Sequence, residues 1–304
     1  MRIAITGGSG FLGRHLARTL AARGHFPTVV ARGLGARGEA LRKEANINFM
    51  PLMMNDERRL FQAFNNCDAI VHLIGINREQ EPNEFKTVHV ENMIRVMTAA
   101  RKAGIPRLIY VSYLKARPDI FSKYLSTKFE AEELLRHSEL DWTIFRPGMI
   151  FGPGDHMISN ISRALDALPI FSPPLSFGSN KIRPVALEDM TELIIAAAVD
   201  GRMIHKTVSV LGPEEMTLGD AVHRIAKVKK KTALVLPLPG LLHLGMAAVM
   251  EKLTDNPLVT VAQIQMLSDD MSTPAKGTDL PDDDLQPKTY LTEELIRAAL
   301  DTQS

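Results

Sequence analysis

A tyrosine and a lysine stand four positions apart in the segment YLSTK, as Tyr124 and Lys128. The surrounding residues predict a helix over 121–138, and residues four apart share one face of a helix. A nearby ammonium group favours the phenolate and lowers the pKa of a tyrosine from about 10. Such a pair can give or take a proton at neutral pH while a hydride moves on a nicotinamide. The same spacing is common on helix surfaces, so it indicates a catalytic pair only if the fold places it at a cofactor site.

Four glycines fall within seven residues of the segment TGGSGFLG, directly after an apolar run and directly before a helical pattern. Gly7, Gly10 and Gly13 have the spacing G-x-x-G-x-x-G. The first glycine permits a tight turn, the second lets the backbone approach a pyrophosphate, and the third lets helix and strand pack closely. The free N–H groups and the positive end of the helix then face the phosphates. This strand–turn–helix context predicts a dinucleotide site rather than a structural turn.

The end of the second predicted strand bears on the choice between NAD(H) and NADP(H). An NAD site usually presents Asp or Glu there, to accept hydrogen bonds from the ribose hydroxyls. This strand ends in Val30, Ala31 and Arg32, and Arg37 follows. Arginine matches the geometry of a 2′-phosphate, so the sequence predicts NADP(H) in preference to NAD(H). The alternative is that Arg32 is a solvated surface residue.

Alternating strand and helix patterns must position these residues. Short apolar runs predict strands at 2–6, 27–32, 47–52, 68–75, 107–112, 142–145 and 205–211. Helical spacing predicts helices at 11–23, 56–65, 85–103, 121–138, 213–227 and 291–301. Strands that alternate with helices imply right-handed crossovers and a parallel sheet covered on both faces. We therefore expect an α/β fold, a Rossmann doubly wound parallel sheet with a smaller mixed C-terminal domain.

The expected domains are a dinucleotide-binding Rossmann domain at 1–153, completed by roughly 184–212, and a smaller substrate or partner domain at 154–304. The smaller domain contains the Leu- and Met-rich segment 234–253. This segment is either core or an exposed apolar groove for a partner or a long-chain ligand.

Composition argues against several classes of protein. The 36 basic and 35 acidic residues nearly cancel, which disfavours a nucleic-acid partner. The single cysteine, Cys67, excludes an internal disulfide and suits a reducing compartment. The nine histidines are not at metal-ligand spacing, so we expect no metal site. We find no signal-peptide pattern and no run of about 18 apolar residues, and we expect a cytoplasmic protein or one peripheral to the inner membrane.

The segments TGGSGFLG, HLIG, YLSTK and RPGMIFGPGD, together with Asn92, resemble the extended form of the short-chain dehydrogenase/reductase superfamily. The likeness extends to an atypical branch that contains the NADPH-binding 39 kDa accessory subunit of respiratory complex I and its free-standing bacterial relatives. The stretches SKYLSTKFEAEELLR and WTIFRPGMIFGPGD are its most specific part. The resemblance covers residues 1–212 well and the remainder only loosely.

The resemblance implies a role for each matching residue. Tyr124 and Lys128 would hold the nicotinamide ribose and form the catalytic pair, with Tyr124 as the proton donor. Arg32 would lie at the adenosine ribose. The remaining cofactor contacts would be, at the pyrophosphate, Gly7, Gly8, Ser9, Gly10, Phe11 and Leu12; along the adenosine and nicotinamide ribose, Leu73, Ile74 and Gly75; at the end of the fifth strand, Val111 and Ser112; and around the nicotinamide, Pro147, Gly148, Met149 and Ile150.

Two positions depart from the family pattern. Active extended reductases carry Ser or Thr at the position of Leu114, where it steadies the substrate oxygen beside the tyrosine. Leucine cannot donate a hydrogen bond, and the loss of one such donor can lower a rate by ~10²–10³ without abolishing the chemistry. The aspartate that usually meets the adenine is replaced by Met53, which affects only affinity.

Three functional hypotheses remain open. The first is an NADP(H)-dependent oxidoreductase acting on an unknown carbonyl or hydroxyl compound. The second is a non-catalytic NADPH-binding structural or assembly protein linked to respiratory complex I or quinone metabolism. The third is an isomerase or epimerase that retains its cofactor. Retention of Tyr124 and Lys128 favours the first hypothesis, and Leu114 favours the second. The expected partners are an unknown small-molecule substrate and either a respiratory complex or a second copy of the chain.

Overall fold

The computed structural model describes residues 1–32, 36–167, 180–234, 245, 247–249, 253, 260–267 and 269–301. The chain divides into two compact units, each built from three segments. The first unit comprises Met1–Arg146, Met190–Ser209 and Lys276–Gln286, and the second comprises Pro147–Asp189, Val210–Ala275 and Pro287–Ser304. Most of the Leu- and Met-rich segment 234–253 lies outside the described residues.

The first unit is built on a single large sheet, with seven strands in the described part of the chain. In the order in which they lie, its strands are β10 (Lys206–Val210), β6 (Asp141–Pro147), β5 (Arg107–Val111), β4 (Ala69–His72), β1 (Arg2–Thr6), β2 (Phe26–Ala31) and β3 (Asn48–Pro51). The five pairings that join β6 through to β3 are all parallel. The strand order reverses at β1, which lies between β2 and β4. In open α/β sheets such a reversal marks the crevice where ligands bind, at the carboxyl ends of the strands.

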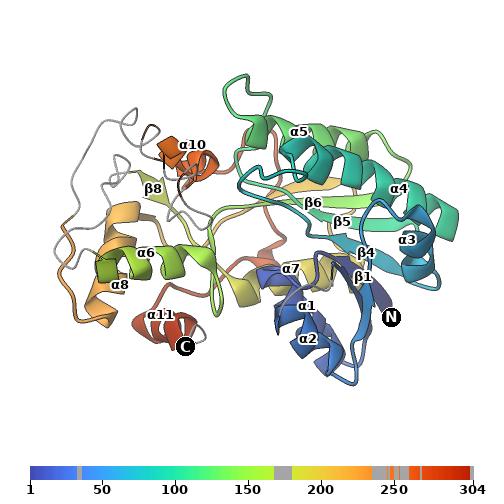
Figure 1. Cartoon of the computed structure of the whole chain (residues 1–304), viewed down its shortest axis with the longest axis horizontal. Coiled ribbons are helices and arrows are strands. Elements are labelled where there is room, and N and C mark those ends of the chain that lie inside the picture. The colour runs from blue at the N-terminus through green and yellow to red at the C-terminus, as the bar shows by residue number, and fades with distance from the viewer. Residues whose placement is uncertain are drawn as a thin grey trace. The chain divides into compact units, whose positions relative to one another are not determined.

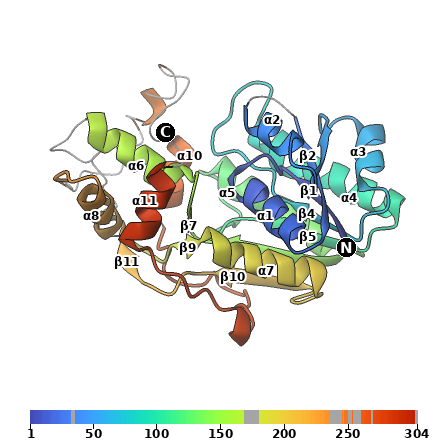
Figure 2. The ribbon, with the colours of Figure 1, turned by 90° about the horizontal axis from the view of Figure 1, so that it is seen from below.

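Helices cover both faces of this sheet (Figure 1). One face carries α3 (Glu57–Phe64), α4 (Asn92–Ala103) and α5 (Lys123–Arg136), and the π-helix η1 (Lys86–Glu91) leads directly into α4. The other face carries α1 (Phe11–Ala22), α2 (Ala36–Arg42) and α7 (Leu187–Val199), and Figure 2 shows α1 and α7 side by side. This is the doubly wound parallel sheet that the sequence predicts.

Apolar side chains fix α4 and α5 on the sheet. Ile70, Leu108 and Ile144 come from three neighbouring strands and pack in one buried cluster with Met93 of α4 and Leu135 of α5. All five side chains are fully buried. Full burial of an aliphatic side chain contributes about 1.5–3 kcal/mol, so the two helices are held firmly enough to carry a precise site.

The second unit is smaller and mixed. Three of its helices pack against one another: α6 (His156–Ala167), α8 (Leu218–Val228) and α11 (Glu293–Asp301). Its other elements are α10 (Val261–Leu267) and the strand pairs β7 (Ile150–Phe151) with β9 (Val185–Ala186) and β8 (Lys181–Ile182) with β11 (Met216–Thr217).

The helix predicted over 213–227 begins later in the structure, at Leu218, because Thr217 caps it. The Thr217 hydroxyl accepts a hydrogen bond from the Asp220 N–H, and the Asp220 carboxylate accepts one from the Thr217 N–H. This reciprocal pair is a capping box, which fixes the first turn of a helix.

Candidate cofactor and catalytic site

The glycine-rich turn after β1 is tightly enclosed by its own neighbours. Gly7 has a φ of 75°, which favours glycine, and its N–H donates to the Val30 carbonyl at 3.0 Å. A Cβ on Gly7 would lie 3.0 Å from the Ile74 nitrogen, and one on Gly13 would lie 2.5 Å from the Gly8 Cα. These approaches involve backbone atoms, which cannot move aside cheaply. The turn therefore requires glycine at both positions.

The N-terminus of α1 opens from this turn. Its cap residue is Gly10, which is exposed and provides no side-chain hydrogen bond to the first turn. Ser9 and Phe11 are partly exposed, and Leu12 is buried. The first N–H groups of a helix have no partner within the helix, and they carry its positive dipole end. The residues present thus fit a pyrophosphate, as the sequence predicts.

The end of β2 lies beside the same turn, because the Val30 carbonyl accepts from Gly7. Arg32 follows two residues later and is exposed. Arg37 falls in α2, and its side chain lies outside the described part of the structure. Met53 is 54% exposed beyond β3. No acidic residue stands at the end of β2, in agreement with the sequence analysis.

Lys128 lies at the carboxyl end of the sheet, in close contact with two of the expected cofactor contacts. Its Nζ donates a hydrogen bond to the Val111 carbonyl at 3.3 Å and lies 5.1 Å from the centre of the Tyr110 ring. A Cβ on Gly75 would lie 3.2 Å from the same nitrogen. Burial lowers the pKa of Lys128 from 10.5 to about 8, and the Glu132 charge opposes this shift. The ammonium form therefore predominates at pH 7.

Tyr124 occupies a pocket of aromatic rings one turn earlier on α5. The rings of His89, Tyr113 and Phe85 meet it edge to face, with centroids 5.5, 5.6 and 5.7 Å away. Burial raises the pKa of Tyr124 above its usual value of 10. The expectation that Lys128 lowers this pKa is therefore wrong for this structure, because desolvation of the phenolate dominates. The phenol therefore carries its proton at neutral pH, as a proton donor must, although burial makes it a weaker acid than a free tyrosine.

His89 belongs to the site, although the sequence analysis did not identify it. Its Nε2 accepts the Ile76 N–H at 3.4 Å, so the proton of the ring lies on Nδ1, which is 2.9 Å from the Thr127 Oγ1. Burial, followed by the charge of Lys128, lowers the pKa of His89 well below 6.5, and the ring stays neutral. Asn92, which is part of the family resemblance, accepts a hydrogen bond from Arg95 of its own helix at 2.9 Å. A single histidine on an apolar helix gives no signal that distinguishes a site residue from a core residue.

Two residues that follow β5, Ser112 and Leu114, determine which polar contacts a ligand could form there. The Ser112 Oγ is fully buried and forms no hydrogen bond within the described residues. A buried hydroxyl in this condition fits a polar group of a bound molecule. Leu114 is completely buried, so the family's usual hydroxyl donor is replaced by a core side chain.

The four residues expected around the nicotinamide, Pro147, Gly148, Met149 and Ile150, belong to the second unit. The Gly148 N–H donates to the Val210 carbonyl at 3.0 Å, and the Met149 carbonyl accepts from the Val185 N–H at 2.8 Å. These bonds order the segment within its own unit. Their contact with a nicotinamide stays a prediction.

Comparison with known proteins supports the cofactor assignment. A family described as NAD(P)H-binding matches residues 7–160, which include the glycine turn, Lys128 and Tyr124. The chain belongs to this NAD(P)H-binding family. The match confirms the Rossmann-type nucleotide-binding fold and a nicotinamide cofactor, and it leaves NADP(H) and NAD(H) undistinguished.

Relatives of this NAD(P)H-binding protein include a reductase and subunits of a respiratory enzyme. Ceramide reductase of Caulobacter vibrioides is 26% identical over 260 residues, which cover 84% of this chain and 80% of that protein. The mitochondrial NADH dehydrogenase (ubiquinone) 1 alpha subcomplex subunit 9 of Mus musculus is 27% identical over 247 residues. That match covers 77% of this chain and 63% of the mouse subunit. The resemblance to the extended short-chain dehydrogenase/reductases and to complex I subunits is confirmed.

Solved structures show the same fold at low identity. MoeE5 in complex with UDP-glucose and NAD superimposes with a TM-score of 0.72 at 17% identity, over 100% of this chain and 98% of that one. UDP-glucuronic acid 4-epimerase from Bacillus cereus gives 0.72 at 16% identity, over 99% and 98%. In the part of the chain that the structure describes, no helix is long and apolar enough to cross a membrane. The same residues hold no group of three or more His, Cys, Asp or Glu side chains that could bind a metal ion.

Proposed function

We propose that this protein is an NADP(H)-dependent oxidoreductase that interconverts a carbonyl and a hydroxyl group on a small molecule. The observation that carries the proposal is the placement of Lys128 and Tyr124 on one face of α5. The Lys128 Nζ is next to Gly75 and bonded to Val111 at the carboxyl end of the parallel sheet. That edge is where ligands bind in this class of fold.

The residues divide the chemistry between them. The glycine turn and the first N–H groups of α1 bind the pyrophosphate, and Lys128 donates hydrogen bonds to the ribose hydroxyls of the nicotinamide half. When bound, the reduced nicotinamide supplies a hydride to the carbonyl carbon. Tyr124 gives its phenolic proton to the carbonyl oxygen, which becomes a hydroxyl, and the phenolate then takes a proton from solvent. The charged Lys128 stabilises that short-lived phenolate.

Arg32 makes NADP(H) the preferred cofactor in this proposal. It is exposed at the end of β2, beside the glycine turn, where a 2′-phosphate would lie. A guanidinium binds a phosphate through paired hydrogen bonds and opposite charge.

A second function has its own support. Leu114 is fully buried where a donor to the substrate oxygen would be needed, and several relatives are named as subunits of NADH dehydrogenase. In this alternative the protein binds NADPH without turnover and docks on a respiratory assembly or on a second copy of itself. It would then lie in the cytoplasm or at the periphery of the inner membrane. In both proposals the Rossmann domain at 1–153, with roughly 184–212, holds the nucleotide, and 154–304 meets the substrate or partner.

A Tyr124→Phe variant separates the two functions. The change removes only the hydroxyl and keeps the ring contacts with His89 and Tyr113. We expect NADPH binding, measured by fluorescence titration, to stay within about twofold of wild type. We expect NADPH oxidation with a panel of carbonyl substrates to fall by ~10²-fold or more. Equal turnover in the variant would remove Tyr124 from the mechanism, and lack of turnover in both proteins would favour the second function.

A further inference from the structure

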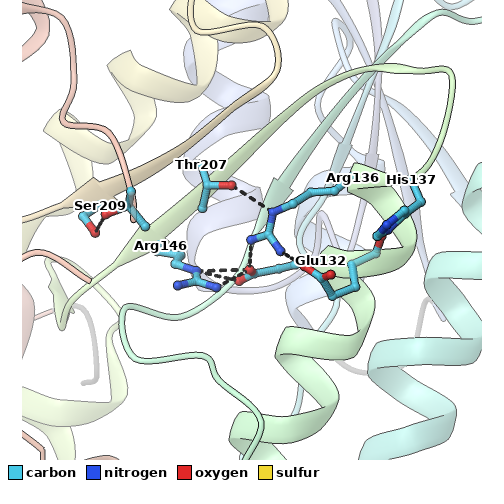
Figure 3. Close-up of polar contacts among 8 residues, drawn as sticks. Glu132, Arg136, His137, Arg146, Thr207 and Ser209 are labelled. Atoms are coloured by element: carbon cyan, nitrogen blue, oxygen red, sulfur yellow. Dashed lines mark hydrogen bonds and ion pairs between the residues drawn. The ribbon is translucent and has the colours of Figure 1, made fainter. Parts of the chain in front are cut away.

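A buried ion-pair network holds α5 to the sheet two turns beyond Tyr124 (Figure 3). The Glu132 carboxylate is completely buried, and Arg146 of β6 contacts both of its oxygens through Nε, at 3.0 and 3.1 Å. Nη2 of Arg146 and Nη2 of Arg136 both bond to the Glu132 Oε2. Arg136 in turn donates from Nε to the Thr207 hydroxyl of β10 at 3.2 Å. The network thus joins α5 to the two strands at one edge of the sheet.

The same carboxylate stands one helical turn from the Lys128 ammonium. Tyr124, Lys128, Glu132 and Arg136 follow one another at intervals of four residues, which places them along one face of α5. A shift of Glu132 along or around the helix axis is therefore a shift of the Tyr124–Lys128 pair as well. Because α5 has no proline or glycine, it transmits such a displacement as a rigid element.

The groups that face Lys128 come from four elements. His72 lies on β4, Tyr110 on β5 and His89 on η1, while Tyr124 and Glu132 lie on α5 itself. The two imidazoles are neutral, since burial lowers the pKa of His72 to about 3 and that of His89 well below 6.5. The Tyr110 and Tyr124 hydroxyls are also uncharged, because burial raises both of their pKa values. Among these neighbours Glu132 is the charged one, so it has the largest electrostatic influence on Lys128.

We propose that Glu132 is a positioning residue of the cofactor site. Held between Arg146 and Arg136, its carboxylate fixes the place of α5 on the sheet, and with it the place of the Lys128 nitrogen beside Gly75 and Val111, one helical turn away. The cofactor-related part of this inference rests on the proposed function, while the link between Glu132 and Lys128 does not depend on it. The link predicts effects of opposite sign for the two ends of the network. Loss of the Glu132 charge leaves the Arg146 guanidinium without its carboxylate partner and favours the neutral form of Lys128, whereas loss of the Arg136 charge favours the ammonium.

The experiment titrates Lys128 directly in the protein without nucleotide. Lysine labelled with ¹³C at Cε reports the charge of each ammonium group by NMR, and the Lys128 signal is assigned by its loss in Lys128→Arg. The variants are Glu132→Gln, Arg136→Met and the control Glu133→Gln. Glu133 is the neighbouring carboxylate on α5, also bonds to Arg136, and is 41% exposed. Affinity for NADPH between pH 6 and pH 10, by fluorescence titration, is the second measurement.

In Glu132→Gln we expect the pH midpoint of the Lys128 titration to fall by about 1, and in Arg136→Met we expect it to rise. In Glu133→Gln it should stay within about 0.2 of the wild-type midpoint, since that carboxylate faces solvent. The alkaline limit of NADPH binding should move with the midpoint in each variant. A folded Glu132→Gln protein with an unmoved midpoint would overturn the inference.

If Glu132→Gln does not fold, Arg136→Met tests the inference alone. Arg136 lies at the partly exposed end of the network, so its replacement disturbs the core less. A midpoint that stays or falls in Arg136→Met would overturn the inference. Opposite shifts in the two variants, with NADPH affinity that does not respond to pH, would uphold the role of Glu132 toward Lys128. That result would refute only the contact between Lys128 and the nucleotide.

Discussion

Replacement of Lys128 by methionine should stabilise the protein while it weakens nucleotide binding. Lys128 is 5% exposed, and burial lowers its pKa from 10.5 to about 8. A tenfold change in a protonation equilibrium corresponds to about 1.4 kcal/mol, so the ammonium form costs the folded state about 3 kcal/mol below pH 8. Methionine has a similar length and shape and carries no charge. We therefore expect Lys128→Met to raise the free energy of unfolding by up to about 3 kcal/mol at pH 7.

The pH dependence gives this prediction its sharpest test. Between pH 8 and 10.5 the unfolded wild-type chain binds more protons at Lys128 than the folded chain does. Wild-type stability should consequently rise with pH across this window, and the advantage of Lys128→Met should shrink and vanish above pH 10.5. Chemical denaturation at several pH values measures both proteins. The matched control is Lys123→Met on the same helix, where the side chain is 78% exposed and the change should be within about 0.5 kcal/mol at all pH values.

Two results would refute this reasoning. The first is a Lys128→Met protein that is less stable than wild type at pH 7, which would mean that the bond to Val111 and the contact with the Tyr110 ring outweigh the desolvation. The second is a stability difference that does not change between pH 8 and 10.5.

Three further predictions follow from the glycine turn, the end of β2 and the buried ion pair. Gly13→Ala should abolish NADPH binding in calorimetry, because its Cβ would lie 2.5 Å from the Gly8 Cα and would displace the turn. Arg32→Glu should weaken NADPH binding by about tenfold or more and NADH binding much less, since only NADPH presents a 2′-phosphate to the new charge; an unchanged ratio of the two affinities contradicts the assignment. Arg146→Met should lower the free energy of unfolding by about 3–5 kcal/mol, because it leaves the buried Glu132 carboxylate with Arg136 as its only ion-pair partner among the described residues, and the double variant Glu132→Leu/Arg146→Met should recover most of it in urea denaturation.

The order of strands and helices around the nucleotide site could be predicted from sequence because it depends on local patterns. Apolar runs indicate the strands. The spacing of Gly7, Gly10 and Gly13 indicates the turn, because the backbone there leaves no room for a Cβ. The sequence also contains a signal for the late start of α8, the T-x-x-D pattern of Thr217 and Asp220, which indicates a helix cap at 217 rather than a helix from residue 213.

The parts that could not be predicted depend on contacts between distant residues. His89 acquires its role from Ile76 and Thr127, which are 13 and 38 residues away. Burial decides the pKa of Tyr124, and the Tyr-x-x-x-Lys spacing contains no information about burial. The change from the π-helix η1 to the α-helix α4 within one predicted helix likewise follows no glycine or proline in the sequence.

The discontinuous first unit has a consequence for the order in which the protein can fold during synthesis. Its sheet needs β10, whose Thr207 and Ser209 exchange backbone hydrogen bonds with Asp279. Arg202, just before that strand, forms ion pairs with Asp282 and Asp284. A ribosome must therefore release almost the entire chain before the nucleotide-binding half is complete. Truncation at residue 146 would leave β6 as a bare sheet edge, open to pairing with other nascent chains.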